Sequence, residues 1–139
     1  MDLRKITEDF SVSPQIAVTD VPAIAEAGYR AILCNRPDGE ETGQPAYDAV
    51  AEAARAAGLA VEYLPVVSGQ VTTADTQAFR AALDSLPGPV LAYCRTGTRC
   101  TVMWSMTQID TLGAGEVLRR TSDAGYDMSG LVARLQSGQ

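Results

Sequence analysis

Residues 90–99 read Val-Leu-Ala-Tyr-Cys-Arg-Thr-Gly-Thr-Arg, and this stretch decides the fold that we expect. Its four apolar residues form a run of the length of a buried strand, and a polar loop with a glycine follows at once. A helix is expected from Arg99 to about Asp110. A buried strand that turns through a short loop into a helix is typical of parallel α/β sheets, and such sheets bind ligands at the carboxyl ends of their strands. Cys94 stands at such an end.

The rest of the chain alternates between extended and helical patterns. Extended segments are expected at 6–12, 29–34 and 59–66; helices are expected at 22–28, 45–57 and 72–86, with two short helical segments after Gly113 and Gly125. The apolar stripe expected on the second helix consists of Ala49, Val50, Ala53, Ala54 and Ala57. This alternation predicts an α/β fold, with a central, mostly parallel sheet flanked by helices, in a single domain over residues 1–139.

The composition excludes several classes of function. The net charge is -6 and there is no basic run, which argues against binding to nucleic acid or to an anionic membrane. No stretch resembles a signal peptide or a membrane span, so a soluble, cytoplasmic protein is expected. The 139 residues include three cysteines and no histidine, which excludes Ser-His-Asp and Cys-His machinery and most zinc sites. We expect neither a metal nor a cofactor.

The loop at residues 94–99 combines several features that stabilise an anion. Its successive backbone N–H groups are expected to turn inward as a nest, and the following helix adds the positive end of its dipole. Gly97 lets the backbone curl without a Cβ, and Arg99 adds a permanently charged fork of donors. These features are expected to lower the pKa of Cys94, so that its thiolate dominates at neutral pH. Cys94 and Arg99 are therefore the predicted catalytic residues.

Other residues are expected to bind the substrate. Thr96, Gly97 and Thr98 would contribute the loop backbone. Arg95 would lie at the mouth and attract anions, or it is an ordinary solvated arginine.

Two further segments are expected near the loop. Asn35, Arg36 and Asp38 follow a neighbouring strand, so they line the pocket or form an ordinary polar turn. The loop that contains Ser68 is a second expected wall of the site.

The sequence also resembles known families at specific stretches. The pattern Cys-Arg-x-Gly-x-Arg at 94–99 is similar to the active loop of rhodaneses, which are sulfurtransferases. Residues 10–15, 34–40, 65–70 and 92–99 resemble the bacterial beta-lactamase-hydrolase-like phosphatase-like domains. This resemblance implies a fold like that of dual-specificity phosphatases. It also implies a link to sulfide oxidation, because some relatives are fused to persulfide dioxygenase domains, which makes such an enzyme a predicted partner.

Three departures from cysteine-dependent phosphatases favour sulfur transfer over phosphate transfer. Arg99 lies one position closer to Cys94 than the loop arginine of those enzymes, and Tyr93 stands where they usually carry a histidine. Ser68 stands about where they carry an aspartate acid, and losing that acid would cost about two to four orders of magnitude in rate. Asp38 or Asp75 could replace it, although no pattern places either there.

The main prediction is therefore a rhodanese-like sulfurtransferase. The Cys94 thiolate would take a sulfane sulfur from a small anionic donor, thiosulfate or a persulfide, and pass it to a thiol acceptor, sulfite or cyanide. The alternatives are a tyrosine or dual-specificity phosphatase and a thiol redox or persulfide sensor.

The other two cysteines also need an interpretation. Cys100 follows the loop arginine, where phosphatase-like enzymes carry a hydroxyl residue, so it is either a resolving thiol for Cys94 or a conservative replacement. Cys34 ends a neighbouring strand, and a buried core thiol is favoured over a role in the site.

Overall fold

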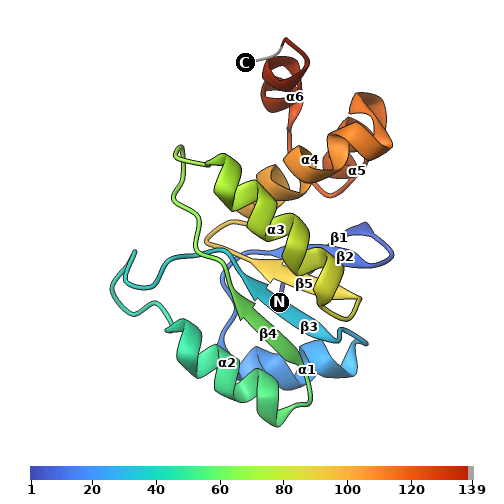
Figure 1. Ribbon diagram of the computed structural model, residues 1–139. Helices are drawn as coiled ribbons and strands as arrows, with labels where there is room; N and C mark the ends of the chain where they lie inside the picture. The colour runs from blue at the N-terminus through green and yellow to red at the C-terminus, as the bar shows by residue number, and fades with distance from the viewer. Residues whose placement is uncertain (138–139) are drawn as a thin grey trace.

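The computed structural model describes residues 1–137, and it contains a five-stranded sheet with helices on both faces (Figure 1). The strands are β1 (Arg4–Thr7), β2 (Phe10–Ser13), β3 (Ala31–Cys34), β4 (Ala60–Tyr63) and β5 (Val90–Tyr93). Their order across the sheet is β1-β2-β5-β3-β4. Only the hairpin of β1 and β2 is antiparallel, and the other three pairings are parallel. The predicted α/β fold with a mostly parallel sheet is confirmed.

The helices divide between the two faces of the sheet (Figure 1). They are α1 (Val21–Glu26), α2 (Tyr47–Ala56), α3 (Thr73–Ser85), α4 (Thr98–Leu112), α5 (Ala114–Asp123) and α6 (Ser129–Gln136), with a 3-10 turn η1 at Val18–Asp20. Helices α1 and α2 pack on one face, and α3 and α4 pack on the other. Helices α5 and α6 contact α4 and each other. Within residues 1–137, no helix is both long and apolar enough to cross a membrane.

The side chains of β5 alternate between the two faces of the sheet, as the pleat of a strand requires. Val90 and Ala92 belong to the core beneath α3 and α4, and the next residue of that parity, Cys94, joins them. Leu91 and Tyr93 belong to the core beneath α1 and α2. The strand therefore directs the thiol of Cys94 toward the start of α4.

Strands β3 and β4 are shorter than predicted, since the segments expected at 29–34 and 59–66 are extended only over Ala31–Cys34 and Ala60–Tyr63, and two further differences have a physical reason. The expected single segment at 6–12 is a hairpin, because the polar residues Thr7, Glu8 and Asp9 form a turn in which the Asp9 N–H donates to Thr7 Oγ1 at 3.1 Å. The buried residues of α2 are Val50, Ala51 and Ala54. Ala49 and Ala57 are exposed, because the stripe that faces the sheet is turned toward Ala51.

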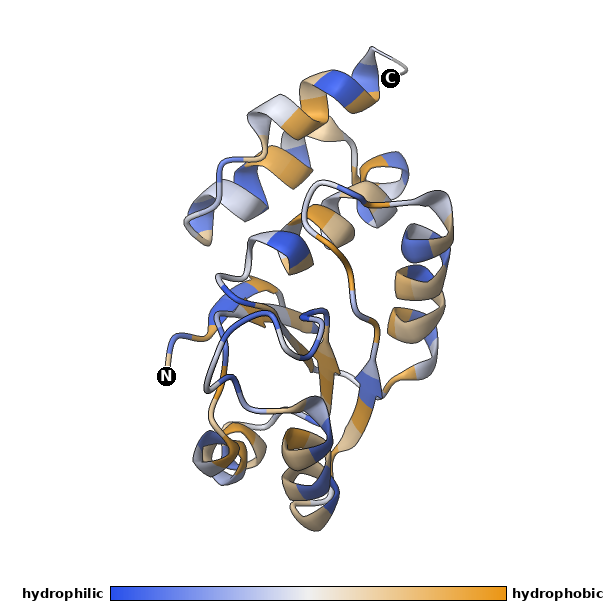
Figure 2. Cartoon of the chain, turned by 90° about the vertical axis from the view of Figure 1, so that its left-hand side faces the viewer, coloured by the Kyte–Doolittle hydropathy of each residue, from blue (hydrophilic) through white to orange (hydrophobic). Residues whose placement is uncertain are grey.

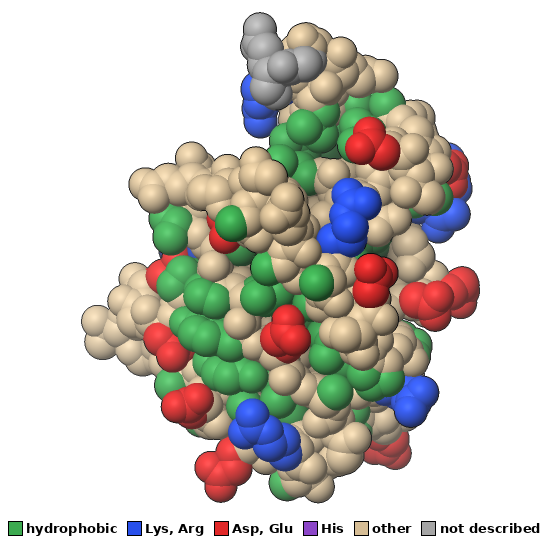
Figure 3. All heavy atoms as spheres, in the orientation of Figure 1, with side chains coloured by type: hydrophobic (Ala, Val, Ile, Leu, Met, Phe, Trp, Pro, Cys, Tyr) green, Lys and Arg blue, Asp and Glu red, His purple; other side chains and the backbone are tan. Residues whose placement is uncertain are grey.

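Polarity follows this arrangement over the whole molecule. Hydrophobic residues concentrate in the strands and alternate with hydrophilic ones along the helices, whereas the connecting loops are mostly hydrophilic (Figure 2). On the face drawn in Figure 3, acidic and basic side chains are scattered singly among hydrophobic and neutral ones. That face carries no continuous stripe of positive charge.

Candidate active site

The loop after β5 places the Cys94 thiol inside a ring of backbone donors. Helix α4 begins at Thr98, and its N-cap Gly97 has a left-handed φ of 89°. That conformation turns the Gly97 N–H toward Cys94, and it donates to Sγ at 3.1 Å. The Tyr126 hydroxyl packs against Gly97 and donates to the Thr96 carbonyl at 3.0 Å. Position 97 requires glycine for two reasons: φ is positive, and a Cβ would overlap the Tyr126 oxygen.

These donors make Cys94 strongly acidic. The Cys100 thiol is the largest cause, since it hydrogen-bonds Cys94, and the backbone N–H groups of Cys100, Thr96 and Gly97 add to it. They outweigh the burial of the sulfur and lower the pKa of Cys94 from 9.0 to about 5. The pKa of Cys100 itself is raised, first by burial and then by Cys94. At neutral pH Cys94 is therefore a thiolate and Cys100 a protonated thiol.

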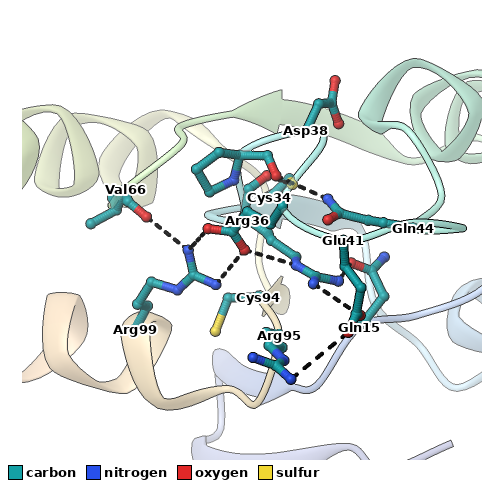
Figure 4. Close-up of polar contacts among 12 residues, drawn as sticks. Gln15, Cys34, Arg36, Asp38, Glu41, Gln44, Val66, Cys94, Arg95 and Arg99 are labelled. Carbon is teal, nitrogen blue, oxygen red and sulfur yellow. Dashed lines mark hydrogen bonds and ion pairs between the residues drawn. The ribbon is translucent and has the colours of Figure 1, made fainter. Parts of the chain in front are cut away.

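Three arginines gather around this thiolate (Figure 4). Arg36, Arg95 and Arg99 line a pocket of about 310 Å³ together with Ser68, Glu40 and Glu41. The Arg95 side chain is 65% exposed and lies 3.8 Å from Glu41. Its predicted role in attracting anions stays a prediction. Arg36 is 2% exposed, which rules out the ordinary polar turn for this residue. Of the two segments expected near the loop, the structure brings Arg36 and Ser68 to the pocket.

Glu40 and Glu41 line this pocket although the sequence did not predict them there, and Glu40 has the stronger contacts. Its carboxylate accepts from Arg99 Nη1 at 2.7 Å and from Arg99 Nη2 at 2.8 Å. It also accepts from Arg36 Nε at 2.9 Å. These contacts, Arg99 before Arg36, lower the pKa of Glu40 to about 2. Glu40 lies in the loop between β3 and α2, and no pattern in the sequence connects it with Arg99.

Cys34 lies on the other face of the sheet from Cys94. It pairs in register with Tyr93 across β3 and β5, so both side chains enter the core beneath α1 and α2. Its thiol donates to the Arg36 carbonyl at 3.3 Å, and burial raises its pKa. This placement fits the interpretation of Cys34 as a buried core thiol. Burial, together with Cys34, also raises the pKa of Tyr93.

The carboxylates that sequence reasoning considered as acids have other partners. Asp38 Oδ1 accepts from the Tyr47 N–H at 2.8 Å, and Asp75 Oδ2 accepts from the Thr72 N–H at 3.0 Å. Both therefore hold helix starts. Asn35 is fully buried and donates to the Leu64 carbonyl at 2.8 Å, so it fastens the strand ends rather than lining the pocket. Within the described part of the chain, no cluster of acidic or cysteine side chains could hold a metal ion.

Comparison with known proteins identifies relatives over most of the chain. Residues 2–111 match the family model described as "Beta-lactamase hydrolase-like protein, phosphatase-like domain". A Beta-lactamase hydrolase-like protein of Xylella fastidiosa is 39% identical over 109 residues, which cover 78% of this chain and 25% of that protein. The chain thus spans about a quarter of the length of the curated relatives that it matches.

Solved structures support the same assignment. A Neisseria meningitidis protein described as a candidate phosphatase is 33% identical, with a TM-score of 0.88 and coverage of 100% of this chain and 99% of that one. Kinase associated phosphatase, at 11% identity and a TM-score of 0.65, covers 93% of this chain and 86% of that one, and it shows the fold alone.

These findings contradict the predicted rhodanese-like sulfurtransferase. The prediction weighed the spacing of one loop and two substitutions, whereas the likeness to phosphatases covers the whole fold. The predicted sulfur donor and acceptor lose their basis with it, and a persulfide dioxygenase partner stays a prediction. The cysteine-phosphatase-like fold implied by the resemblance is confirmed. The chain belongs to the family described as Beta-lactamase hydrolase-like protein, phosphatase-like domain.

Proposed function

We propose that this protein is a cysteine-dependent phosphatase that hydrolyses phosphate monoesters through Cys94. One observation carries the proposal: a thiolate with a pKa of about 5 lies within a ring of backbone N–H groups beside a pocket lined by three arginines. A nest of N–H groups at a helix start with an adjacent arginine is a site for a tetrahedral anion. The same thiolate, at neutral pH, is a nucleophile.

The reaction would proceed in two displacements. The Cys94 thiolate attacks phosphorus, an S–P bond forms, and the ester P–O bond breaks to release an alkoxide or phenoxide. Water then attacks the phosphocysteine, the S–P bond breaks, and inorganic phosphate leaves with Cys94 restored as the thiolate. The N–H groups of the loop and Arg99 would neutralise the equatorial phosphoryl oxygens, where charge is spread in the transition state.

Substitution of the nucleophile tests the proposal. Cys94→Ser should lower the turnover of p-nitrophenyl phosphate by about 10³-fold or more, because the hydroxyl is not ionised at neutral pH. Cys34→Ser is the matched control, since it makes the same change in a thiol on the opposite face of the sheet. Equal turnover by the wild type and Cys94→Ser, or no turnover by either, would contradict a Cys94-dependent phosphatase.

A further inference from the structure

The guanidinium of Arg99 is held by one of its edges. Nη1 donates to Glu40 Oε2 and to the Val66 carbonyl at 3.0 Å, and Nη2 donates to Glu40 Oε1. Three of the five N–H donors of the guanidinium are thereby used. Within residues 1–137, the structure gives no protein acceptor to the Nε–H or to the second Nη2–H of Arg99. These two donors are parallel and form the side fork of the guanidinium, which matches two oxygens of a phosphate.

A second arginine, Arg36, also holds the Glu40 carboxylate in place. Arg36, whose side chain is 2% exposed, donates from Nε to Glu40 and from Nη1 to Gln15 Oε1 at 3.0 Å. Its Nη2 donates to Glu41 at 3.3 Å. The carboxylate of Glu40 therefore lies between a buried arginine and the arginine of the loop. Because the side chains come from three separate segments of the chain, this network sets the direction of Arg99.

We propose that Glu40 is a positioning residue, whose carboxylate holds one edge of Arg99 so that the side fork of the guanidinium is presented to the phosphoryl group of a phosphate monoester. Glu40 acts through Arg99 and does not itself touch the substrate. The inference rests on the proposed function for its substrate class. It adds a residue to the site whose effect is on anion binding and on transition-state charge.

The test measures anion binding without turnover. Iodoacetamide should alkylate the Cys94 thiolate, and inorganic phosphate bound above it should slow the alkylation. Glu40→Gln keeps the shape of the side chain and removes its charge. It should weaken the protection by phosphate about tenfold or more, as expected for loss of a charged hydrogen bond. Glu40→Asp, which keeps the charge on a shorter side chain, should recover part of that loss.

A matched control exists on α5. Glu116 also binds an arginine with both oxygens, accepting from Arg119 Nε and Nη2 at 2.8 Å each, and from Arg120 Nε at 2.9 Å. Arginine contacts, Arg119 first, lower its pKa to about 2, as for Glu40. Glu116→Gln therefore removes the same kind of pair away from the loop, and it should leave the protection by phosphate unchanged. Thermal denaturation of each variant checks that it is folded.

Turnover then separates positioning from other roles. Glu40→Gln should lower kcat/KM by the same factor for an aryl and for an alkyl phosphate, since Arg99 holds the phosphoryl group and not the leaving group. A larger loss on the alkyl phosphate would make Glu40 a general acid and overturn the inference. Tighter protection by phosphate in Glu40→Gln would make Glu40 a competitor of the anion, which also overturns it.

The two proposals fail in different ways. If phosphate protects Cys94 but the wild type has no turnover, the proposed function fails and the inference is decided by Glu40→Gln alone. If the wild type turns over and Glu40→Gln binds phosphate as tightly, the function stands and the inference fails. If phosphate does not protect the wild type, Arg99 presents no anion site and the inference falls.

Discussion

At the scale of single residues, the acidity of Cys94 has a measurable consequence. Alkylation by iodoacetamide should follow a titration with a midpoint near pH 5, the pKa of Cys94, and should modify Cys94 alone at neutral pH. The pKa values of Cys34 and Cys100 are raised, so both stay protonated there. Peptide mass spectrometry after alkylation at several pH values checks this. Modification of Cys34 before Cys94 would contradict the placement of the thiolate.

The same pKa has a consequence for stability. Because the pKa of Cys94 is lower in the folded state than its usual 9.0, the unfolded state binds more protons between about pH 5 and pH 9. The contribution of Cys94 to the free energy of unfolding therefore rises with pH through this window and is lost as the pH falls through 5.

The Cys100 thiol should control the acidity of its neighbour. Cys100→Ala removes the largest cause of the lowered pKa and leaves the backbone donors, so the pKa of Cys94 should rise. Cys100→Ser keeps a donor at the same position and should leave the pKa of Cys94 low. The pH dependence of alkylation in the two variants measures the difference, and an identical midpoint in both would show that the thiol contributes nothing. The predicted role of Cys100 as a resolving thiol is a separate matter and stays a prediction.

Gly97 should tolerate no side chain. Gly97→Ala puts a Cβ onto the Tyr126 hydroxyl at a positive φ, so it must strain the backbone or displace that hydroxyl from the Thr96 carbonyl. A loss of stability of about 1–3 kcal/mol, together with a raised pKa of Cys94, is expected. Chemical denaturation and alkylation measure the two effects. Gly115, whose Cβ would meet no atom, is the control position for a glycine-to-alanine change.

The residues that could be predicted from the sequence are those that lie next to one another in it. Cys94, Gly97 and Arg99 occupy one loop, so strand, turn and helix patterns suffice to bring them together. Glu40 could not be predicted in the same way, because 59 positions separate it from Arg99 and only the folded sheet brings the two into contact. The burial of the Arg36 side chain could not be predicted from the sequence for the same reason.

At the scale of elements, the start of α3 illustrates what local patterns predict well. Thr72 Oγ1 accepts from the Asp75 N–H at 3.1 Å, and Asp75 accepts from the Thr72 N–H, which forms a capping box. Thr72→Ala should lower the free energy of unfolding by about 1 kcal/mol. Thr73→Ala is the control, since Thr72 and not Thr73 is the cap. Urea denaturation measures both, and equal losses would contradict the assignment.

The elements that were predicted less well are those whose ends depend on the rest of the fold. Local signals predict a helix start at Thr72 or Thr73, and in the structure Thr72 is the cap, bonded to the Asp75 N–H three residues on. The sequence pattern predicts one extended segment over residues 6–12, whereas the structure has a turn at Glu8 and Asp9. The antiparallel pairing of β1 with β2 makes this segment a hairpin. The face of α2 that is buried depends on where the sheet lies, and small alanine side chains mark that face weakly.

At the scale of the whole molecule, the predicted class of fold was right and the predicted chemistry was wrong. Both conclusions used the resemblance, but the chemistry was drawn from differences at Tyr93, Ser68 and the spacing of Arg99. The structure explains why such differences mislead. The backbone donors, Arg95 and Arg99 come from one loop, whereas Arg36 and Ser68 reach the pocket from two other loops, so a change at Ser68 leaves the donors around Cys94 in place.

The missing aspartate should nevertheless affect the choice of substrate. Ser68, which lines the pocket where a phosphatase would carry its aspartate, has no carboxylate of its own. Asp38 and Asp75 accept hydrogen bonds from helix starts instead. If the protein hydrolyses phosphate monoesters, aryl esters, whose phenoxide leaves unaided, should therefore react about 10²-fold or more faster than alkyl esters. Comparing kcat/KM for p-nitrophenyl phosphate and an alkyl phosphate, with inorganic phosphate release as the common readout, measures this. Ser68→Asp should reduce the difference in kcat/KM between the aryl and the alkyl ester. Equal kcat/KM values for the two esters in the wild type would reveal a general acid at the pocket.

The pleat of β5 has a consequence for how this protein can vary over evolutionary time. Neighbouring residues of the strand face opposite cores, so the loss or gain of one residue between Val90 and Tyr93 would exchange the places of Cys94 and Tyr93. The thiol would then enter the layer beneath α1 and α2, far from its donors. Relatives can therefore replace the apolar side chains of this strand by others of similar size, but they cannot change its length by an odd number of residues and keep the nucleophile.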